Sequence, residues 1–112
     1  MAGVSLLGMV KHIVMWKLRG PSAAEKREQA GQVRAALEAL RGKIPGLSSL
    51  EVGVNVAEDE QLADVVLIST HNDWAALTEY QGHPAHLEAA QVIAALRTER
   101  RVLDFEVAGA AG

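Results

Sequence analysis

The chain has 112 residues, of which 49% are hydrophobic and 22% are charged, a composition typical of a single folded domain with a modest core. The net charge of −3 provides no electrostatic basis for binding nucleic acid, and the absence of cysteine excludes disulfides, thiol catalysis and cysteine-bound zinc. The absence of cysteine fits a reducing cytoplasm, where we expect the protein, and no membrane partner is expected because no apolar run approaches the roughly 20 residues that cross a bilayer.

The folded domain is predicted to span residues 9–107, between a short N-terminal extension (1–8) and a flexible tail (108–112). Its first element is a strand from Met9 to Leu18, which is apolar on both alternating sets of positions. His12 shares one face of this strand with Val14 and Trp16. A strand of this kind is expected to have most of both faces covered.

A helix is predicted after the break at Gly20-Pro21. Ser22 and Glu25 have the spacing of a capping box, and Pro45-Gly46 ends the segment. Gly31 inside the helix weakens it unless another element packs closely there. Apolar residues recur at spacings of four, three and four, which predicts one buried stripe: Val33, Leu37, Leu40 and Ile44.

Two more strands are predicted on either side of an acidic loop, residues 57–63. Residues 47–56 alternate between apolar and other side chains, as in a half-buried strand, and Gly53 indicates a bulge. Residues 64–70 form a strand that is apolar on both faces.

The last third of the chain is predicted to contain two short helices and a final strand. Asn72-Asp73 can cap a helix over residues 74–81, and His83-Pro84 starts a new helix because proline suits the first helical position. The final strand is predicted over residues 101–107. The core face of the second helix is predicted to consist of Ala89, Val92, Ile93 and Leu96.

The order strand, helix, strand, strand, helix, strand is that of an α+β ferredoxin-like fold, with a four-stranded antiparallel sheet and helices on one face. Helices cover only one side of such a sheet, yet the first and third strands are apolar on both sides. A large apolar surface of this kind usually marks an association surface. We therefore expect a homodimer in which two sheets pack face to face as a closed barrel.

The chain resembles the stress-responsive dimeric α/β-barrel (Dabb) domain family from about Met9 to Val107. Five short segments in the family's order carry the resemblance, and each alone is weak. They are Val10-Lys11-His12-Ile13-Val14, Lys43-Ile44-Pro45-Gly46, Val52-Gly53-Val54-Asn55, Asp64-Val65-Val66-Leu67 and Tyr80-Gln81-Gly82-His83-Pro84-Ala85-His86. The resemblance implies the ferredoxin-like fold and the dimer.

The enzymatic branch of this family includes plant polyketide cyclases resembling olivetolic acid cyclase, which perform a cofactor-free intramolecular aldol condensation. The histidine and tyrosine that do the acid–base work in that branch fall on His86 and Tyr80, and its strand histidine falls on His12. Where that branch lines its pocket with aromatic residues of the first helix, this chain has Val33 and Leu37. This departure implies a pocket of a different shape, whereas the resemblance implies that no cofactor is needed.

His86, Tyr80 and His12 are the candidate catalytic residues. His86 lies near the start of a helix, where the macrodipole disfavours the imidazolium and leaves a neutral general base. Tyr80 could orient a substrate carbonyl or donate to a developing enolate. The alternative is that these side chains only bond to one another or to the backbone. The predicted substrate pocket consists of Val14, Trp16, Val33, Leu37, Leu67 and His83, although His83 is also a candidate helix cap.

A metal site is not expected, because His83 and His86 share a helical face but no third ligand is evident beyond His71, Asp73 and Asp64. Three functions are compatible with the sequence. The first is a cofactor-independent enzyme of the cyclase or aldol type that acts on a carbonyl or polyketide-like substrate. The second is a non-catalytic, stress-associated dimer that binds a small hydrophobic molecule. The third, by analogy of fold alone, is a cofactor-free monooxygenase.

Overall fold

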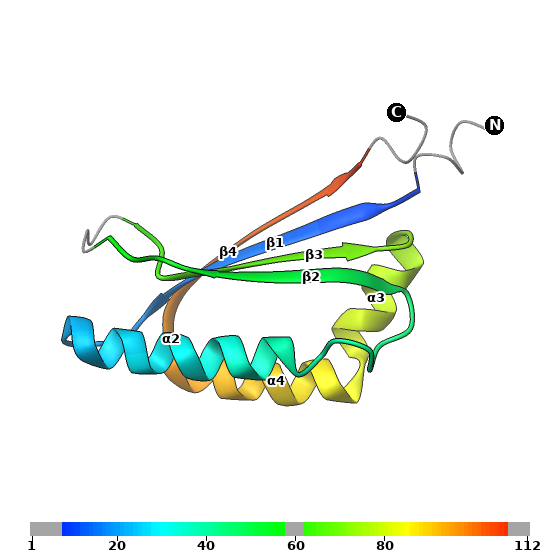
Figure 1. Cartoon of the computed structure of the whole chain (residues 1–112). Helices are drawn as coiled ribbons and strands as arrows, with labels where there is room; N and C mark the ends of the chain where they lie inside the picture. The colour runs from blue at the N-terminus through cyan, green and yellow to red at the C-terminus, as the bar shows by residue number, and fades with distance from the viewer. Residues whose placement is uncertain (1–7, 58–61, 108–112) are drawn as a thin grey trace.

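The computed structural model describes residues 8–57 and 62–107, which form one antiparallel sheet with all helices on the same side (Figure 1). The predicted extension, apart from Gly8, the tail 108–112 and residues 58–61 of the acidic loop lie outside the described residues. The strand order is β2-β3-β1-β4. The strands are β1 (Val10–Leu18), β2 (Leu47–Val54), β3 (Val65–His71) and β4 (Arg97–Glu106), and the helices are α2 (Ala23–Glu38), α3 (Trp74–Gly82) and α4 (Pro84–Leu96). The predicted ferredoxin-like fold is confirmed.

Helix α2 begins as the sequence predicts and ends earlier. The backbone N–H of Glu25 donates to Ser22 Oγ at 3.1 Å, which confirms Ser22 as the N-cap, and the Ser22 hydroxyl donates to Glu25 Oε1 at 3.0 Å. The helix ends at Glu38 rather than at Pro45, and turns follow through Gly42, whose φ of 75° lies in the left-handed region. Leu40 and Ile44 nevertheless remain buried from these turns.

The two short helices are separated at residue 83, as predicted. Asp73 caps α3 by accepting the backbone N–H of Ala76 at 2.7 Å. His83 caps α4, because its Nδ1 accepts the backbone N–H of Ala85 at 3.0 Å, and Pro84 follows as the first helical residue. This break places Tyr80 near the end of one helix and His86 near the start of the next.

Three further details differ from the sequence-based expectations. The register runs unbroken through Gly53, and the shift in β2 lies between Leu47 and Ser49. Gly53 instead allows a close approach, because a Cβ there would lie 2.9 Å from Val66 Cγ1. Val92 is 42% exposed and does not belong to the core face of α4. Strand β4 begins at Arg97 rather than at residue 101, since it pairs with β1 as far as Leu18 despite its charged sequence.

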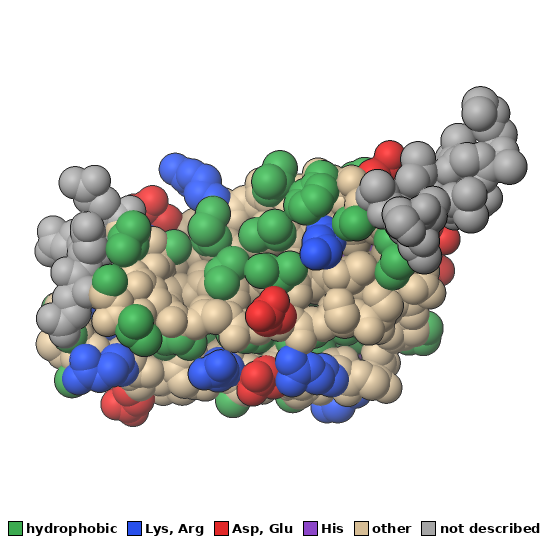
Figure 2. Space-filling view, turned by 45° about the horizontal axis from the view of Figure 1, so that its top comes forward, with side chains coloured by type: hydrophobic (Ala, Val, Ile, Leu, Met, Phe, Trp, Pro, Cys, Tyr) green, Lys and Arg blue, Asp and Glu red, His purple; other side chains and the backbone are tan. Residues whose placement is uncertain are grey.

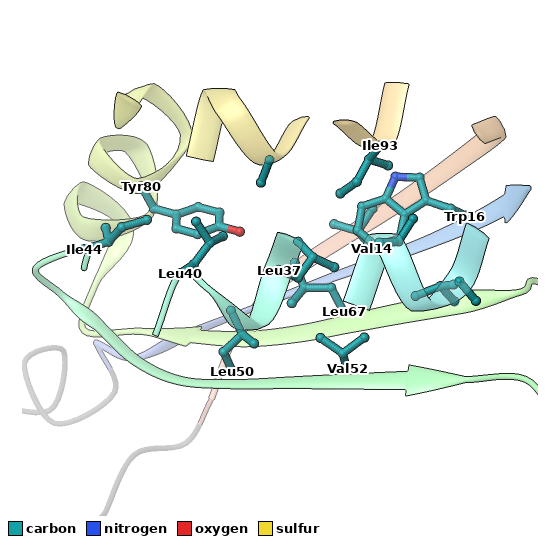
Figure 3. Packing of buried hydrophobic residues seen from close by; sticks show 14 of the residues in the cluster. Val14, Trp16, Leu37, Leu40, Ile44, Leu50, Val52, Leu67, Tyr80 and Ile93 are labelled. Atoms are coloured by element: carbon teal, nitrogen blue, oxygen red, sulfur yellow. The ribbon is translucent and has the colours of Figure 1, made fainter. Parts of the chain in front are cut away.

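The core lies between the sheet and the helices (Figure 3). The positions of β1 that face this layer are His12, Val14, Trp16 and Leu18, together with Val10, and each is at most 5% exposed. His12 therefore faces the helices. Tyr80 enters the same layer from α3 and is fully buried.

The outer face of the sheet, on the side away from the helices, carries a band of apolar side chains. The register places them together on β1, β3 and β4, and Figure 2 shows hydrophobic side chains gathered on this face between flanking lysine or arginine side chains. The band consists of Ile13, Met15, Val66, Ile68, Leu103 and Phe105. Met15, Leu103 and Phe105 are 43%, 60% and 39% exposed in the single chain. An exposed band of this kind supports face-to-face association of two copies.

We predict that Leu103→Glu weakens this association by at least about tenfold, because it places an unpaired carboxylate in an apolar contact. Light scattering coupled to gel filtration over a dilution series measures the change. Leu87→Glu is the matched control, since Leu87 is an exposed leucine on α4, away from the outer face. Unchanged mass in Leu103→Glu, or equal dissociation in both variants, would contradict the prediction.

Candidate functional site

A cavity of about 250 Å³ lies between the sheet and the helices. Its floor comes from β1 and β3, and its roof comes from α4. The polar side chains that line it are His12, Tyr80, His86, Arg97 and Arg100. The apolar walls consist of Val14, Trp16, Leu37, Leu67, Ile93 and the α4 alanines Ala89, Ala90 and Ala94.

Most of the predicted site residues line this cavity. His12, Tyr80 and His86 are brought together from β1, α3 and α4, and Val14, Trp16, Leu37 and Leu67 form walls around them. Two predicted pocket residues do not line it. Val33 is fully buried in the core one turn before Leu37, and the His83 ring is engaged in capping α4.

The His86 ring is held in one tautomer by the backbone. Its Nδ1 lies 3.0 Å from the carbonyl oxygen of Gln81, which can only accept, so Nδ1 carries the proton and Nε2 keeps its lone pair. Burial lowers the pKa of His86. The hydrogen bond to Gln81 opposes this shift, and the nearby His12 and Arg100 lower the pKa further. His86 is therefore a neutral imidazole with a basic nitrogen near pH 7.

Tyr80 presents a protonated hydroxyl to the cavity. The side chain is 0% exposed, and its hydroxyl forms no hydrogen bond within the described part of the chain. Burial raises its pKa to about 12. The Tyr80 and His86 ring centroids are 4.6 Å apart, and Figure 3 shows the Tyr80 oxygen directed into the layer between sheet and helices. A buried donor without an acceptor is costly, and a ligand oxygen could satisfy it.

His12 is oriented by a carboxylate from the neighbouring strand. Its Nδ1 lies 2.5 Å from Asp104 Oδ1, and the register places these two residues opposite each other on β1 and β4. The carboxylate accepts a hydrogen bond from Nδ1–H and fixes the orientation of the ring, as a carboxylate on the other ring nitrogen of a functional histidine commonly does. The His12 and Tyr80 ring centroids are 5.9 Å apart.

His71 is a buried neighbour of the site, a position that the sequence did not predict. The predicted strand ended at residue 70, whereas β3 includes His71 and buries it completely. Its Nε2 lies 2.9 Å from Ser69 Oγ, and its ring centroid is 4.7 Å from that of Tyr80. Burial, with the nearby His12, lowers its pKa to about 4. The alternation of the strand, continued by one residue, would have placed it on the face of His12.

Arg97 and Arg100 were also missed, because the final strand was predicted to begin only at residue 101.

In the described ranges, no group of three or more His, Asp or Glu side chains could hold a metal ion. Nor does the described chain contain a helix long and apolar enough to span a membrane.

These features define a class of protein: a ferredoxin-like domain with an apolar outer face and a polar cavity beneath its helices. The family model for the stress responsive A/B barrel domain (Dabb) matches residues 10–107, and the chain belongs to this family. No curated protein matches the chain.

Solved structures share the fold over most of their length. A dimeric ferredoxin-like protein of unknown function from Bacteroides fragilis is 33% identical, with a TM-score of 0.79 over 89% of this chain and 97% of that one. A dimeric ferredoxin-like protein of unknown function from Thermobifida fusca is 23% identical, with a TM-score of 0.77 over 89% and 92%. Hydroxynitrile lyase from Passiflora edulis is 18% identical, with a TM-score of 0.74 over 90% and 94%. The dimeric neighbours support a homodimer here.

The lowered pKa of His71 predicts a loss of stability in acid. The unfolded chain takes up this proton near pH 6.5, and the folded protein resists it down to about 4. The free energy of unfolding should therefore fall between these two pH values, by about 2–3 kcal/mol from this residue. Urea unfolding at pH 7.5 and 4.5 measures the fall, which should be smaller in His71→Asn than in the wild type. His83→Asn, which keeps a capping side chain, should retain it, and equal falls in all three proteins would refute the assignment.

Proposed function

We propose that the protein is a cofactor-independent acid–base enzyme that abstracts a proton next to the carbonyl group of a small substrate. One observation carries the proposal: the neutral imidazole of His86 and the unpartnered hydroxyl of Tyr80 line the same cavity, with ring centroids 4.6 Å apart. A base and a hydrogen-bond donor in one cavity are the two groups that enolate formation needs.

The proposed reaction begins when the Tyr80 hydroxyl donates a hydrogen bond to the substrate carbonyl oxygen. His86 Nε2 then takes the proton from the adjacent carbon, and the electron pair of that C–H bond moves into the enolate, whose oxygen Tyr80 stabilises. In an aldol step, the enolate carbon attacks a second carbonyl carbon, and the new alkoxide recovers a proton from the imidazolium. The His12–Asp104 pair borders Tyr80 and holds the polar wall in place.

The size of the cavity favours a compact substrate. Its volume of about 250 Å³ lies below the roughly 300–1,000 Å³ of pockets that take drug-sized ligands. Trp16 and Leu37 narrow it from β1 and α2. We therefore infer a small carbonyl compound rather than an extended aromatic polyketide. The similarity to the polyketide cyclases stays a prediction.

The acid–base roles predict large losses of activity from single substitutions. Exchange of the α-protons of small aldehydes and ketones with D2O, followed by NMR, is the direct measurement of the first step. His86→Gln should lower the exchange rate by about 100-fold or more because it removes the base, and Tyr80→Phe should lower it by a similar factor because it removes the donor. His83→Asn is the control and should retain the rate.

A wild-type protein that binds these compounds in the cavity but exchanges no protons would instead identify a non-catalytic binding protein. The same conclusion would follow if His86→Gln exchanged protons as fast as the wild type. Melting temperatures of the variants separate a lost base from a lost fold.

The pH dependence of the rate should show one limb. Because the pKa of His86 is lowered from 6.5, exchange should rise with pH below 6.5 and reach its plateau before neutrality. Tyr80 has a pKa of about 12 and stays protonated, so no alkaline decline is expected up to about pH 10. A steady rise in the rate from pH 7 to 9 would contradict the assignment of His86 as the base.

A further inference from the structure

We propose that the cavity recognises a carbonyl compound that also carries a carboxylate, and that Arg97 and Arg100 bind this carboxylate. The proposal rests on the proposed function for the position of the reacting carbonyl, at Tyr80. It adds the chemical class of the substrate and two residues that determine specificity.

An irregularity in β4 places both arginines on the cavity side of the sheet. Residues three apart in a regular strand point to opposite faces, because side chains alternate with a period of two. Here Arg97 pairs with Leu18 and Arg100 pairs with Trp16, and the register shifts between Lys17 and Leu18. The extra residue of this bulge reverses the alternation, so both guanidinium groups share the face of Trp16 and both line the cavity.

Neither arginine has its charge neutralised by an acidic side chain of the described chain. Other cationic side chains do form such pairs, as Lys26 does with Asp64 and Arg34 with Glu38. Two carboxylates share the cavity face of β4, and both are engaged elsewhere: Asp104 is bonded to His12, and Glu106 accepts a hydrogen bond from Trp74 Nε1. Two guanidinium groups at one cavity, with no acidic partner among the described residues, favour an anionic ligand.

The field of Arg100 reaches the reacting groups. Arg100 lines the same cavity as Tyr80 and His86, and beside the larger effect of burial its charge lowers the pKa of both side chains. The fully buried Tyr80 hydroxyl, which has no partner among the described residues, marks a second polar position in the same cavity. Apolar walls from Trp16 and Ile93 also line the cavity. These positions fit a carbonyl oxygen, a carboxylate and an apolar body between them.

The experiment compares 3-benzoylpropionate, which has a ketone and a carboxylate, with its neutral methyl ester by titration calorimetry on the full chain. We expect the acid to bind at least about tenfold more tightly than the ester. Arg97→Gln and Arg100→Gln should each remove most of this preference, and the double variant should bind acid and ester alike. Lys43→Gln removes the same charge from an exposed lysine that does not line the cavity, and should keep the preference.

Two further measurements guard against an effect of folding. Arg97→Lys and Arg100→Lys retain the positive charge and should keep part of the preference at an unchanged melting temperature. Raising the NaCl concentration should weaken binding of the acid and leave the ester unaffected. Equal binding of acid and ester, a preference that survives in the double variant, or no binding of the acid would each overturn the proposal.

The outcome is separable from that of the proposed function. Preference for the acid without α-proton exchange would retain the anion site and reject the enzyme. Proton exchange that is equally fast with neutral ketones and shows no dependence on the two arginines would retain the enzyme and reject the anion site.

Discussion

The structure depends on a central strand that must cover both of its faces. Strand β1 pairs with β3 on one side and β4 on the other, so its backbone groups are satisfied within the sheet. Its side chains are apolar on both faces, but the helices of a single chain cover only one of them. The other face is left for a second copy, and the helix-covered face encloses the cavity lined by His12, Tyr80 and His86.

That enclosed layer is not purely apolar, and this gives it chemical capacity. Burial removes water from His71, His86 and Tyr80, so each side chain is favoured in its neutral form. A neutral imidazole can accept a proton and a neutral phenol can donate a hydrogen bond. The fold therefore tolerates the cost of burying two polar groups that form no hydrogen bond within the described chain, His71 Nδ1 and the Tyr80 hydroxyl.

The residues of the cavity differ in their exposure to solvent. Tyr80 is fully buried, whereas Arg97 is half-buried and Arg100 is exposed. A ligand that enters with a charged group outermost would keep that charge near the two guanidinium groups and in contact with solvent. The carbonyl oxygen of the ligand would then lose its hydrating water only at the position where the Tyr80 hydroxyl can donate a hydrogen bond in its place. The two proposals therefore describe one binding orientation.

Several features followed from the sequence alone because they are set by local chemistry. The cap at Ser22, the helix break at His83-Pro84 and the alternation that places His12 with Val14 and Trp16 depend on neighbouring residues only. The five short segments that resemble the family, which occur in the family's order, then extended the prediction to the whole fold. Tyr80 and His86 were found in the same way, since one short segment contains both.

Other features were decided only by tertiary structure. Arg97 belongs to β4 because β4 pairs with β1, although the charged sequence of this segment does not predict a strand. The bulge beside Leu18 determines which way the Arg97 side chain faces. His71 becomes a core residue because β3 continues one residue further along β1 than its own composition indicates. His83 and Val33 were assigned to the pocket by proximity in sequence, but capping and core packing take them out of it. Strand pairing between distant segments sets all of these positions, and its register cannot be derived from local preference.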